Sequence, residues 1–232
     1  MAAKPPPLRP EDFWAERLGC AAAALVQPGF LRVPLPREAV FAVATRAAVV
    51  AAAPERLHAR LRGASDPRAL VTRAGLAELF PEAVRFVGPA RVDYLHHQVS
   101  APPGVVALEP RDARVAALRD AATGEEWQHA DLFAAETPVF AVELEGALAA
   151  AAGFERLLGR VAHLRVLAHP RHRGRGAGRR VVQAAAARAQ SLGLLPQYQT
   201  LAANAPSVAV AAALGFEAFA TTLTAVLRSA HE

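Results

Sequence analysis

Apolar and polar positions along the chain switch repeatedly between the spacing of strands and the spacing of helices. In the first hundred residues, short apolar runs predict strands over residues 31–34, 39–44, 47–53 and 90–98. Apolar residues at helical spacing, bounded by proline or glycine, predict helices over residues 11–26, 55–62 and 70–80. The second and third strands would form a hairpin whose turn is Thr45-Arg46.

The same patterns continue beyond residue 105. Strands are predicted over residues 138–145, 147–154, 160–168, 195–203 and 216–227, and helices over residues 111–122, 178–192 and 205–214. The first two of these strands would form a hairpin about Glu145-Gly146, and residues 125–133 fit either pattern. Three strands followed by alternating helices and strands are typical of a mixed sheet with crossover helices, so the sequence predicts an α/β fold.

A linker signal divides the chain. Residues 101–104 read Ala-Pro-Pro-Gly, and such a cluster breaks both helices and strands. We therefore expect an N-terminal α/β half over residues 1–104 and a second domain over residues 105–232. Short similarities join the halves: VFAV occurs at 40–43 and 139–142, and ERLxxR at 55–60 and 155–160. Chance similarity and a degenerate internal duplication both explain them, and both stay open.

Composition limits the class of protein. Hydrophobic residues make up 53% of the chain, enough to bury a core. The single cysteine, Cys20, excludes an internal disulfide framework and fits a reducing compartment. The first residues carry prolines and acids where a signal peptide needs an apolar run. Apolar runs also stay far below the roughly 20 residues that span a bilayer. These features predict a cytoplasmic protein with no membrane partner.

Positive charge is concentrated in one part of the sequence. Between Glu155 and Glu217 there are nine arginines and no acidic residue. The whole chain has a formal net charge of +5, so the remainder carries −4. Only this segment therefore favours a polyanionic partner.

Three of these arginines lie in HPRHRGRGAG, residues 169–178, between a predicted strand and a predicted helix. A glycine-rich turn in that place can direct backbone N–H groups and the positive end of a helix dipole at one phosphate. Gly174, Gly176 and Gly178 are expected to permit positive φ and a close backbone approach. A Walker loop would need a lysine, and a dinucleotide fingerprint would need glycine at Arg179, so neither motif fits.

The pattern that does fit is R-x-x-G-x-G, formed by Arg173, Gly176 and Gly178. With VLAHP before it and LAANAPSVAVAAALGF after it, the chain resembles the GNAT acyltransferase superfamily over about residues 110–228. The order PQYQT…N…S…LGF is most similar to the glycine N-acyltransferase-like branch. The resemblance implies a GNAT-type acyl-CoA-binding fold, with acetyl-CoA or another acyl-CoA as co-substrate. The N-terminal half would then be an accessory part or a degenerate copy.

The resemblance also assigns residues to the cofactor. It places the pantetheine arm along the strand before the loop, at Val166, Leu167 and Ala168. It places the pyrophosphate on the backbone of Arg173, Gly174, Arg175, Gly176, Ala177, Gly178 and Arg179. The side chains of Arg173, Arg175, Arg179 and Arg180 can supply charge-assisted contacts, and the surplus arginines suit the 3′-phosphate. Asn204 and Ser207 follow the next strand, where the family contacts the cofactor. Asn204 could equally cap the following helix, and that alternative stays open.

Two catalytic groups common in the family are missing. A tyrosine that protonates the leaving thiolate would stand at Ala211, and a glutamate base would stand near Ala162. The candidate replacements are Tyr198 as acid, and His163 or Glu143 as base. For Tyr198 and His163, burial in the core without a chemical role is the open alternative. No metal is expected, because the adjacent His96 and His97 would point to opposite faces of a strand.

The expected function is an N-acetyltransferase in which a primary amine attacks the thioester of acetyl-CoA directly, in a ternary complex. The N-terminal half would shape the acceptor site or provide a homodimer face. Two other classes stay open. One is a catalytically silent acyl-CoA-binding or regulatory protein, and the other is a nucleic-acid-binding module. The nucleic-acid module is disfavoured because no aromatic residues interleave with the arginines.

Overall fold

The structure is a computed structural model that describes residues 8–136 and 138–228. The proline-rich start of the chain, residues 1–7, lies outside the described part. The chain forms two compact units. Unit 1 takes in the described residues up to Val92, then Thr200–Ala205 and the described residues from Ala218 onward. Unit 2 comprises Asp93–Gln199 and Pro206–Glu217. The expected domains, 1–104 and 105–232, stay a prediction.

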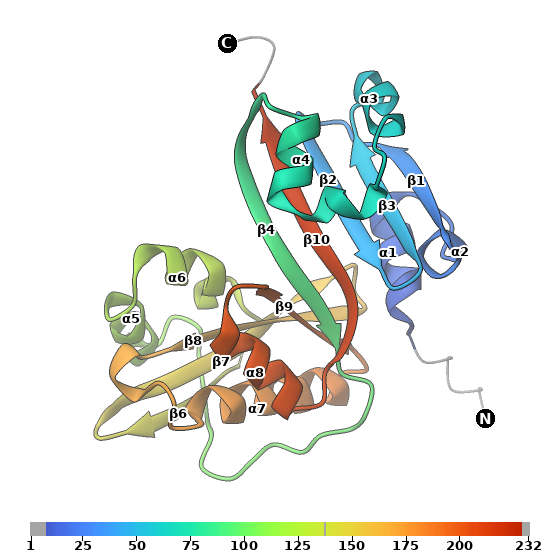
Figure 1. The fold of residues 1–232 in the computed structure, drawn as a ribbon. Coiled ribbons are helices and arrows are strands. Elements are labelled where there is room, and N and C mark those ends of the chain that lie inside the picture. Colours follow the sequence, from blue (N-terminus) through green and yellow to red (C-terminus); the bar gives the residue numbers. More distant parts are fainter. Residues whose placement is uncertain (1–7, 137, 229–232) are drawn as a thin grey trace, which may run out of the picture. The chain divides into compact units, whose positions relative to one another are not determined.

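Each unit combines helices with a mixed set of strands, which confirms the predicted α/β class (Figure 1). In unit 1 the strand order is β1-β3-β2-β10-β4. β1 is parallel to β3, whereas β2 is antiparallel to both β3 and β10. The bounds are β1 Gly29–Pro34, β2 Ala39–Thr45, β3 Ala48–Ala53, β4 Ala83–Tyr94 and β10 Glu217–Leu227.

Helices cover both faces of these strands. The bounds are α1 Pro10–Leu18, α2 Ala23–Val26, η1 Glu55–Leu57, α3 His58–Arg62, η2 Pro67–Val71 and α4 Arg73–Leu79. Leu61 of α3 and Leu76 of α4 pack on one face with Val40. On α1, Trp14 stacks on Phe41 of β2, with ring centroids 6.1 Å apart. Alternating burial along the strands thus forms two apolar layers.

Two predicted boundaries in this unit were wrong. The single helix over residues 11–26 is broken, because Gly19 adopts a left-handed conformation (φ 66°) and its N–H bonds back to carbonyls of α1. The strand expected over residues 90–98 begins at Ala83 and ends at Tyr94. Pro89 lies within that strand, and proline is a poor signal for a strand interior because it donates no hydrogen bond.

The two ERLxxR segments have different structures. Residues 55–60 lie in η1 and α3, whereas residues 155–160 form the end of a strand and the turn after it. By contrast, both VFAV segments lie in the first strand of an antiparallel hairpin. The ERLxxR similarity therefore gives no support to a duplication.

Unit 2 has the strand order β9-β8-β7-β6-β5. β8 is parallel to β9, and the other neighbours are antiparallel. The predicted hairpin turn at Glu145-Gly146 is confirmed, with both residues at positive φ. A short strand beside β6 was missed, directly after the linker signal. The bounds are β5 Val106–Leu108, β6 Val139–Leu144, β7 Ala147–Leu157, β8 Val161–Ala168 and β9 Leu195–Leu201.

Helices lie on both faces of this sheet as well. The bounds are α5 Ala113–Asp120, α6 Gly124–Ala130, η3 Leu132–Ala134, η4 Pro170–His172, α7 Ala177–Ser191 and α8 Ala205–Ala213. One apolar cluster joins Val181 and Ala185 of α7 to Leu164 of β8. Another joins Val115 of α5 to Leu167 of β8. Alternation along β8 therefore directs Leu164 toward α7 and residues 163, 165 and 167 toward α5 and α6.

Candidate functional site

The candidate site begins at the loop between β8 and α7. Gly174 has φ 78° and Gly176 has φ 79°, a conformation that costs glycine nothing. Gly176 is the residue before α7, and no side chain caps that helix. The first N–H groups of α7 have no acceptor within the helix, and the helix dipole adds positive potential there. This helix start has the properties of an anion site.

Gly178 has a different role from the one expected. It lies in the first turn of α7 and has no positive φ, so backbone conformation does not require glycine there. A Cβ built on Gly178 would meet nothing within 4 Å. The space beside Gly178 is therefore open.

Two loop arginines are held by carboxylates of neighbouring elements. Arg173 Nη2 lies 2.5 Å from Glu126 Oε1 of α6, and Arg175 Nη1 lies 2.6 Å from Glu145 Oε1 of the β6–β7 turn. The pKa of Glu145 is lowered, mainly by its hydrogen bond from Arg175. About half of each arginine side chain is exposed, so solvent weakens both ion pairs. An anion at the helix start can compete for these guanidinium groups.

Arg180 contacts the linker instead. Its Nη2 donates to the carbonyl of Pro103, next to Gly104, whose φ is 68°. This contact connects the first turn of α7 to the segment that precedes β5.

His172 is buried. Its side chain is only 6% exposed and lies against His169, with ring centroids 5.1 Å apart. His169 in turn organises the turn η4, because its Nδ1 accepts the Arg171 N–H at 3.1 Å. Burial lowers the pKa of His169, with nearby positive charge acting in the same direction. The loop is therefore a packed turn ahead of the glycines.

The last residues of β8 have one open backbone edge. β8 pairs with β7 as far as Ala168, whereas its parallel pairing with β9 stops at Leu164 opposite Tyr198. Within the described chain, no strand pairs with the β9 side of residues 165–168. This edge includes Val166, Leu167 and Ala168 and leads directly to the loop.

Asn204 and Ser207 lie at the start of α8. Asn204 directly precedes the helix, and its N–H bonds to the carbonyl of Leu201. Ser207 lies in the first turn and hydrogen-bonds Tyr198. Burial raises the pKa of Tyr198, and this hydrogen bond only partly offsets the effect. The Tyr198 side chain is 2% exposed and packs against Phe216 in the α7 layer.

His163 lies on the other face of the sheet. Its Nδ1 is 3.1 Å from Gln197 Oε1, and Gln197 Nε2 donates to the hydroxyl of Tyr94. The structure thus places His163 and Tyr198 on opposite sides of β8 and β9. Gln197 and Tyr94 were missed by sequence reasoning, because a polar residue in a strand carries no local sign of its partner.

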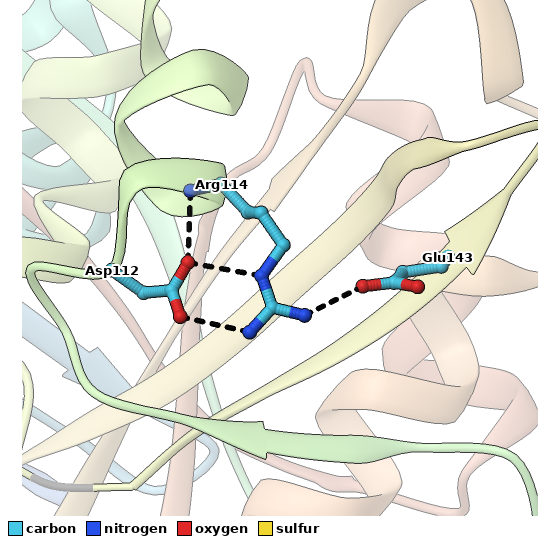
Figure 2. Close-up of polar contacts among 3 residues, drawn as sticks. All are labelled: Asp112, Arg114 and Glu143. Carbon is cyan, nitrogen blue, oxygen red and sulfur yellow. Dashed lines mark hydrogen bonds and ion pairs between the residues drawn. The ribbon is translucent and has the colours of Figure 1, made fainter.

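Glu143, the third catalytic candidate, is held by Arg114 (Figure 2). Arg114 Nη1 lies 2.8 Å from Glu143 Oε1, while its Nε and Nη2 bond both oxygens of Asp112. Asp112 also accepts the Arg114 N–H as the cap of α5. These bonds lower the pKa of Asp112 to about 2. The structure therefore brings Glu143 together with α5 rather than with His163 or Tyr198.

The last two properties concern metal-binding groups and membrane-spanning helices among the described residues. Among the described residues, no group of three His, Cys, Asp or Glu side chains is placed to hold a metal ion. No helix in the described ranges is long and apolar enough to cross a membrane.

Comparison with solved structures finds several similar chains that are described as GNAT-family or GCN5-related acetyltransferases. A GNAT-family chain from Novosphingobium aromaticivorans is 27% identical, with a TM-score of 0.49, covering 63% of this chain and 67% of that one. An acetyltransferase of the GNAT family from Colwellia psychrerythraea is 15% identical, with a TM-score of 0.48 and coverages of 67% and 62%. A GCN5-related N-acetyltransferase from Kribbella flavida is 19% identical, with a TM-score of 0.48 and coverages of 69% and 65%.

The matched part spans about two thirds of the length of each of these chains. No curated protein matches the sequence. Residues 104–216 match the family model of the Acetyltransferase (GNAT) family. This range includes β8, the glycine loop and α7. Residues 104–216 are thus similar to the GNAT family of acetyltransferases, over just under half of the chain.

Proposed function

We propose that this protein transfers an acetyl group from acetyl-CoA to a primary amine by direct attack within a ternary complex. One observation carries the proposal: the open edge of β8 over residues 165–168 leads into the uncapped start of α7. An extended amide-containing chain fits such an edge, and a pyrophosphate fits such a helix start. Acyl-CoA has both parts in that order.

Each part of the substrate has a proposed partner. The pantetheine arm pairs along Val166, Leu167 and Ala168, and the pyrophosphate accepts N–H groups from residues 173–179. The arginines of the loop supply charge-assisted contacts to the phosphates. Asn204 and Ser207, at the start of α8, remain proposed cofactor contacts. No metal is needed for this binding.

The chemistry requires three proton movements. The acceptor arrives as an ammonium ion and loses one proton to a base, and its nitrogen lone pair then attacks the thioester carbonyl. A backbone N–H of β8 stabilises the oxyanion that forms. The attached nitrogen gives up its second proton, collapse breaks the C–S bond, and the leaving thiolate takes up a proton. The products are the amide and CoA thiol, and the proton on the base is released to solvent.

His163 is the proposed base, because an imidazole accepts a proton near neutral pH. Tyr198 is the proposed acid, and its raised pKa keeps the hydroxyl protonated. Glu143 is retained as a weaker candidate base, since its carboxylate is bound to Arg114. A thiol is a good leaving group, so the acid is needed less than the base.

The test combines binding and turnover. Calorimetric titration with CoA should show one site, and release of free thiol from acetyl-CoA should depend on an added amine. The panel should include glycine and other amino acids, because we propose the glycine N-acyltransferase-like branch as the finer assignment. Tight CoA binding with no transfer to any amine would support the silent binding protein instead. DNA binding that CoA does not compete away would support the nucleic-acid module.

Two further parts of the proposal concern the whole protein. The single cysteine supports a location in the reducing cytoplasm, which cell fractionation can check. A homodimer is the proposed assembly, and light scattering of the purified chain would show its mass.

A further inference from the structure

Three polar side chains form a chain of hydrogen bonds on the face of β8 opposite α7. His163 Nδ1 lies 3.1 Å from Gln197 Oε1, and Gln197 Nε2 donates to Tyr94 Oη. Gln197 is 2% exposed and Tyr94 is fully buried, whereas His163 is partly exposed. The three residues come from β8, β9 and the end of β4, and all belong to unit 2.

The direction of these bonds determines the tautomer of His163. A glutamine amide has one acceptor end and one donor end. Its donor end is directed to Tyr94, so its carbonyl faces Nδ1 of His163 and can only accept. Nδ1 must then carry the hydrogen, and Nε2 carries the lone pair. With the amide turned the other way, Gln197 would donate to Nδ1 and accept from the Tyr94 hydroxyl, which corresponds to the Nε2–H tautomer, so the orientation of the amide and the tautomer of His163 are linked.

We propose that Gln197 and Tyr94 are positioning residues for His163, holding the proton on Nδ1 so that Nε2 accepts the proton of the acceptor's ammonium group. The inference rests on the proposed function. The proton moves from the acceptor nitrogen to Nε2, and the freed lone pair forms the C–N bond of the tetrahedral intermediate. The imidazolium then keeps its bond from Nδ1–H to the Gln197 carbonyl.

The charged groups packed around His163 are already engaged with one another. Glu155 of β7 stands opposite His163 in the sheet register, and its carboxylate is 2.5 Å from Arg165 Nη2 of β8. The charged side chains of α5 and α6 and of the cap of α5 form the pairs Arg114 with Asp112 and Glu143, Arg119 with Asp120, Glu125 with His129, and Glu126 with Arg173. Gln197 is a neutral hydrogen-bond partner of the imidazole.

Three variants separate positioning from folding. Gln197→Leu removes the acceptor for Nδ1–H and should lower kcat/KM at least about tenfold, within the range that a general base supplies. Gln197→Glu places a carboxylate beside Nδ1–H, which favours the imidazolium and should move the acid limb of the kcat/KM profile to higher pH. Tyr94→Phe leaves the amide in place without its second bond and should lower kcat/KM by a smaller factor. CoA affinity should stay at the wild-type value in all three.

Gln190→Leu is the matched control. Its amide also bridges two chain segments, donating to the His97 carbonyl at 2.7 Å and accepting the Val99 N–H at 3.0 Å. The same truncation there should lower thermal stability without moving the pH profile.

A second readout needs no turnover. The ¹⁵N spectrum of histidine-labelled protein should show the Nδ1–H tautomer for the His163 resonance, identified by its absence in His163→Gln. In Gln197→Leu this preference should weaken. A wild-type Nε2–H tautomer, or a pH profile that Gln197→Glu does not move in a folded, CoA-binding protein, would overturn the inference. Absence of turnover in the wild type would overturn the proposed function instead, and the spectrum would still test the tautomer.

Discussion

Arg173 and Glu126 lie 47 positions apart in sequence, and their Nη2 and Oε1 atoms are 2.5 Å apart. The ion pair joins the loop before α7 to the first turn of α6. Glu126 also closes a capping box, because its carboxylate accepts the Thr123 N–H while Thr123 caps the Glu126 N–H. One carboxylate therefore serves the start of α6 and an arginine of the proposed phosphate site.

Glu126→Gln should tighten CoA binding. Glutamine keeps the capping box, but it no longer competes with phosphate for the Arg173 guanidinium. Exposed ion pairs contribute about 0.2–1 kcal/mol, so we expect an affinity gain of up to about fivefold by calorimetry. Glu125→Gln removes the same charge one residue earlier, where Glu125 faces His129, and should change affinity less. Equal effects of the two variants would mean that only net charge matters.

Gly178→Ala should weaken CoA binding without destabilising the protein. The backbone at Gly178 has no positive φ, and alanine favours a helix over glycine by up to about 1 kcal/mol. The added Cβ would project into the open space proposed for the pyrophosphate, so we expect at least about a tenfold loss of affinity, or about 1.4 kcal/mol. Thermal melting and calorimetry measure the two effects separately.

Gly124→Ala is the control for this substitution. Gly124 is the first residue of α6, and a Cβ there also meets nothing within 4 Å. This variant should keep the wild-type affinity. If Gly178→Ala also keeps it, the pyrophosphate does not lie over the first turn of α7.

Tyr198→Phe should slow turnover without changing CoA affinity. The hydroxyl is bonded to Ser207, and burial keeps it protonated by raising its pKa. Loss of this proposed proton donor should lower kcat by about tenfold or less, below the usual range for acid catalysis, because a thiolate leaves readily. Thr222→Val removes a different buried hydroxyl, which lies in unit 1. This variant controls for a simple loss of stability. An unchanged kcat in Tyr198→Phe would assign the residue to core packing alone.

Asp112 should make stability fall in acid. Its folded-state pKa is about 2, below the roughly 3.9 of an unfolded aspartate. Its contribution is therefore complete above about pH 4 and is lost as the pH falls toward 2. Asparagine still caps a helix but has no charge to lose, so Asp112→Asn should show a shallower fall in melting temperature over this interval.

Asp66→Asn provides the comparison, because Asp66 also caps a helical turn, accepting the Arg68 N–H at 2.9 Å. This variant should keep a slope close to that of the wild type. If both variants give the same slope as the wild type, the bonds from Arg114 to Asp112 do not contribute to stability in solution.

The sequence by itself determined the local parts of the candidate site. The strand before the loop, the glycine turn and the following helix were predicted with nearly correct bounds, because strand periodicity and helix-start signals act over a few neighbouring residues. The same reasoning failed where a local signal was ambiguous. It predicted a single helix that continued through Gly19, where α1 ends. It placed the start of β4 after Pro89, whereas the strand begins before that residue, at Ala83. It also expected a positive φ at Gly178, which the structure does not have.

Only the tertiary structure decided which distant residues meet. The partners Tyr94 and Gln197 are 103 positions apart, and His163 and Gln197 are 34 apart. The register of β8 against β9 brings His163 beside Gln197, and the end of their pairing at Leu164 leaves the open edge. Register and burial are properties of whole elements packed together, so no short stretch of sequence contains them. The loop could be predicted for this reason, whereas the partners of its arginines and of His163 could not.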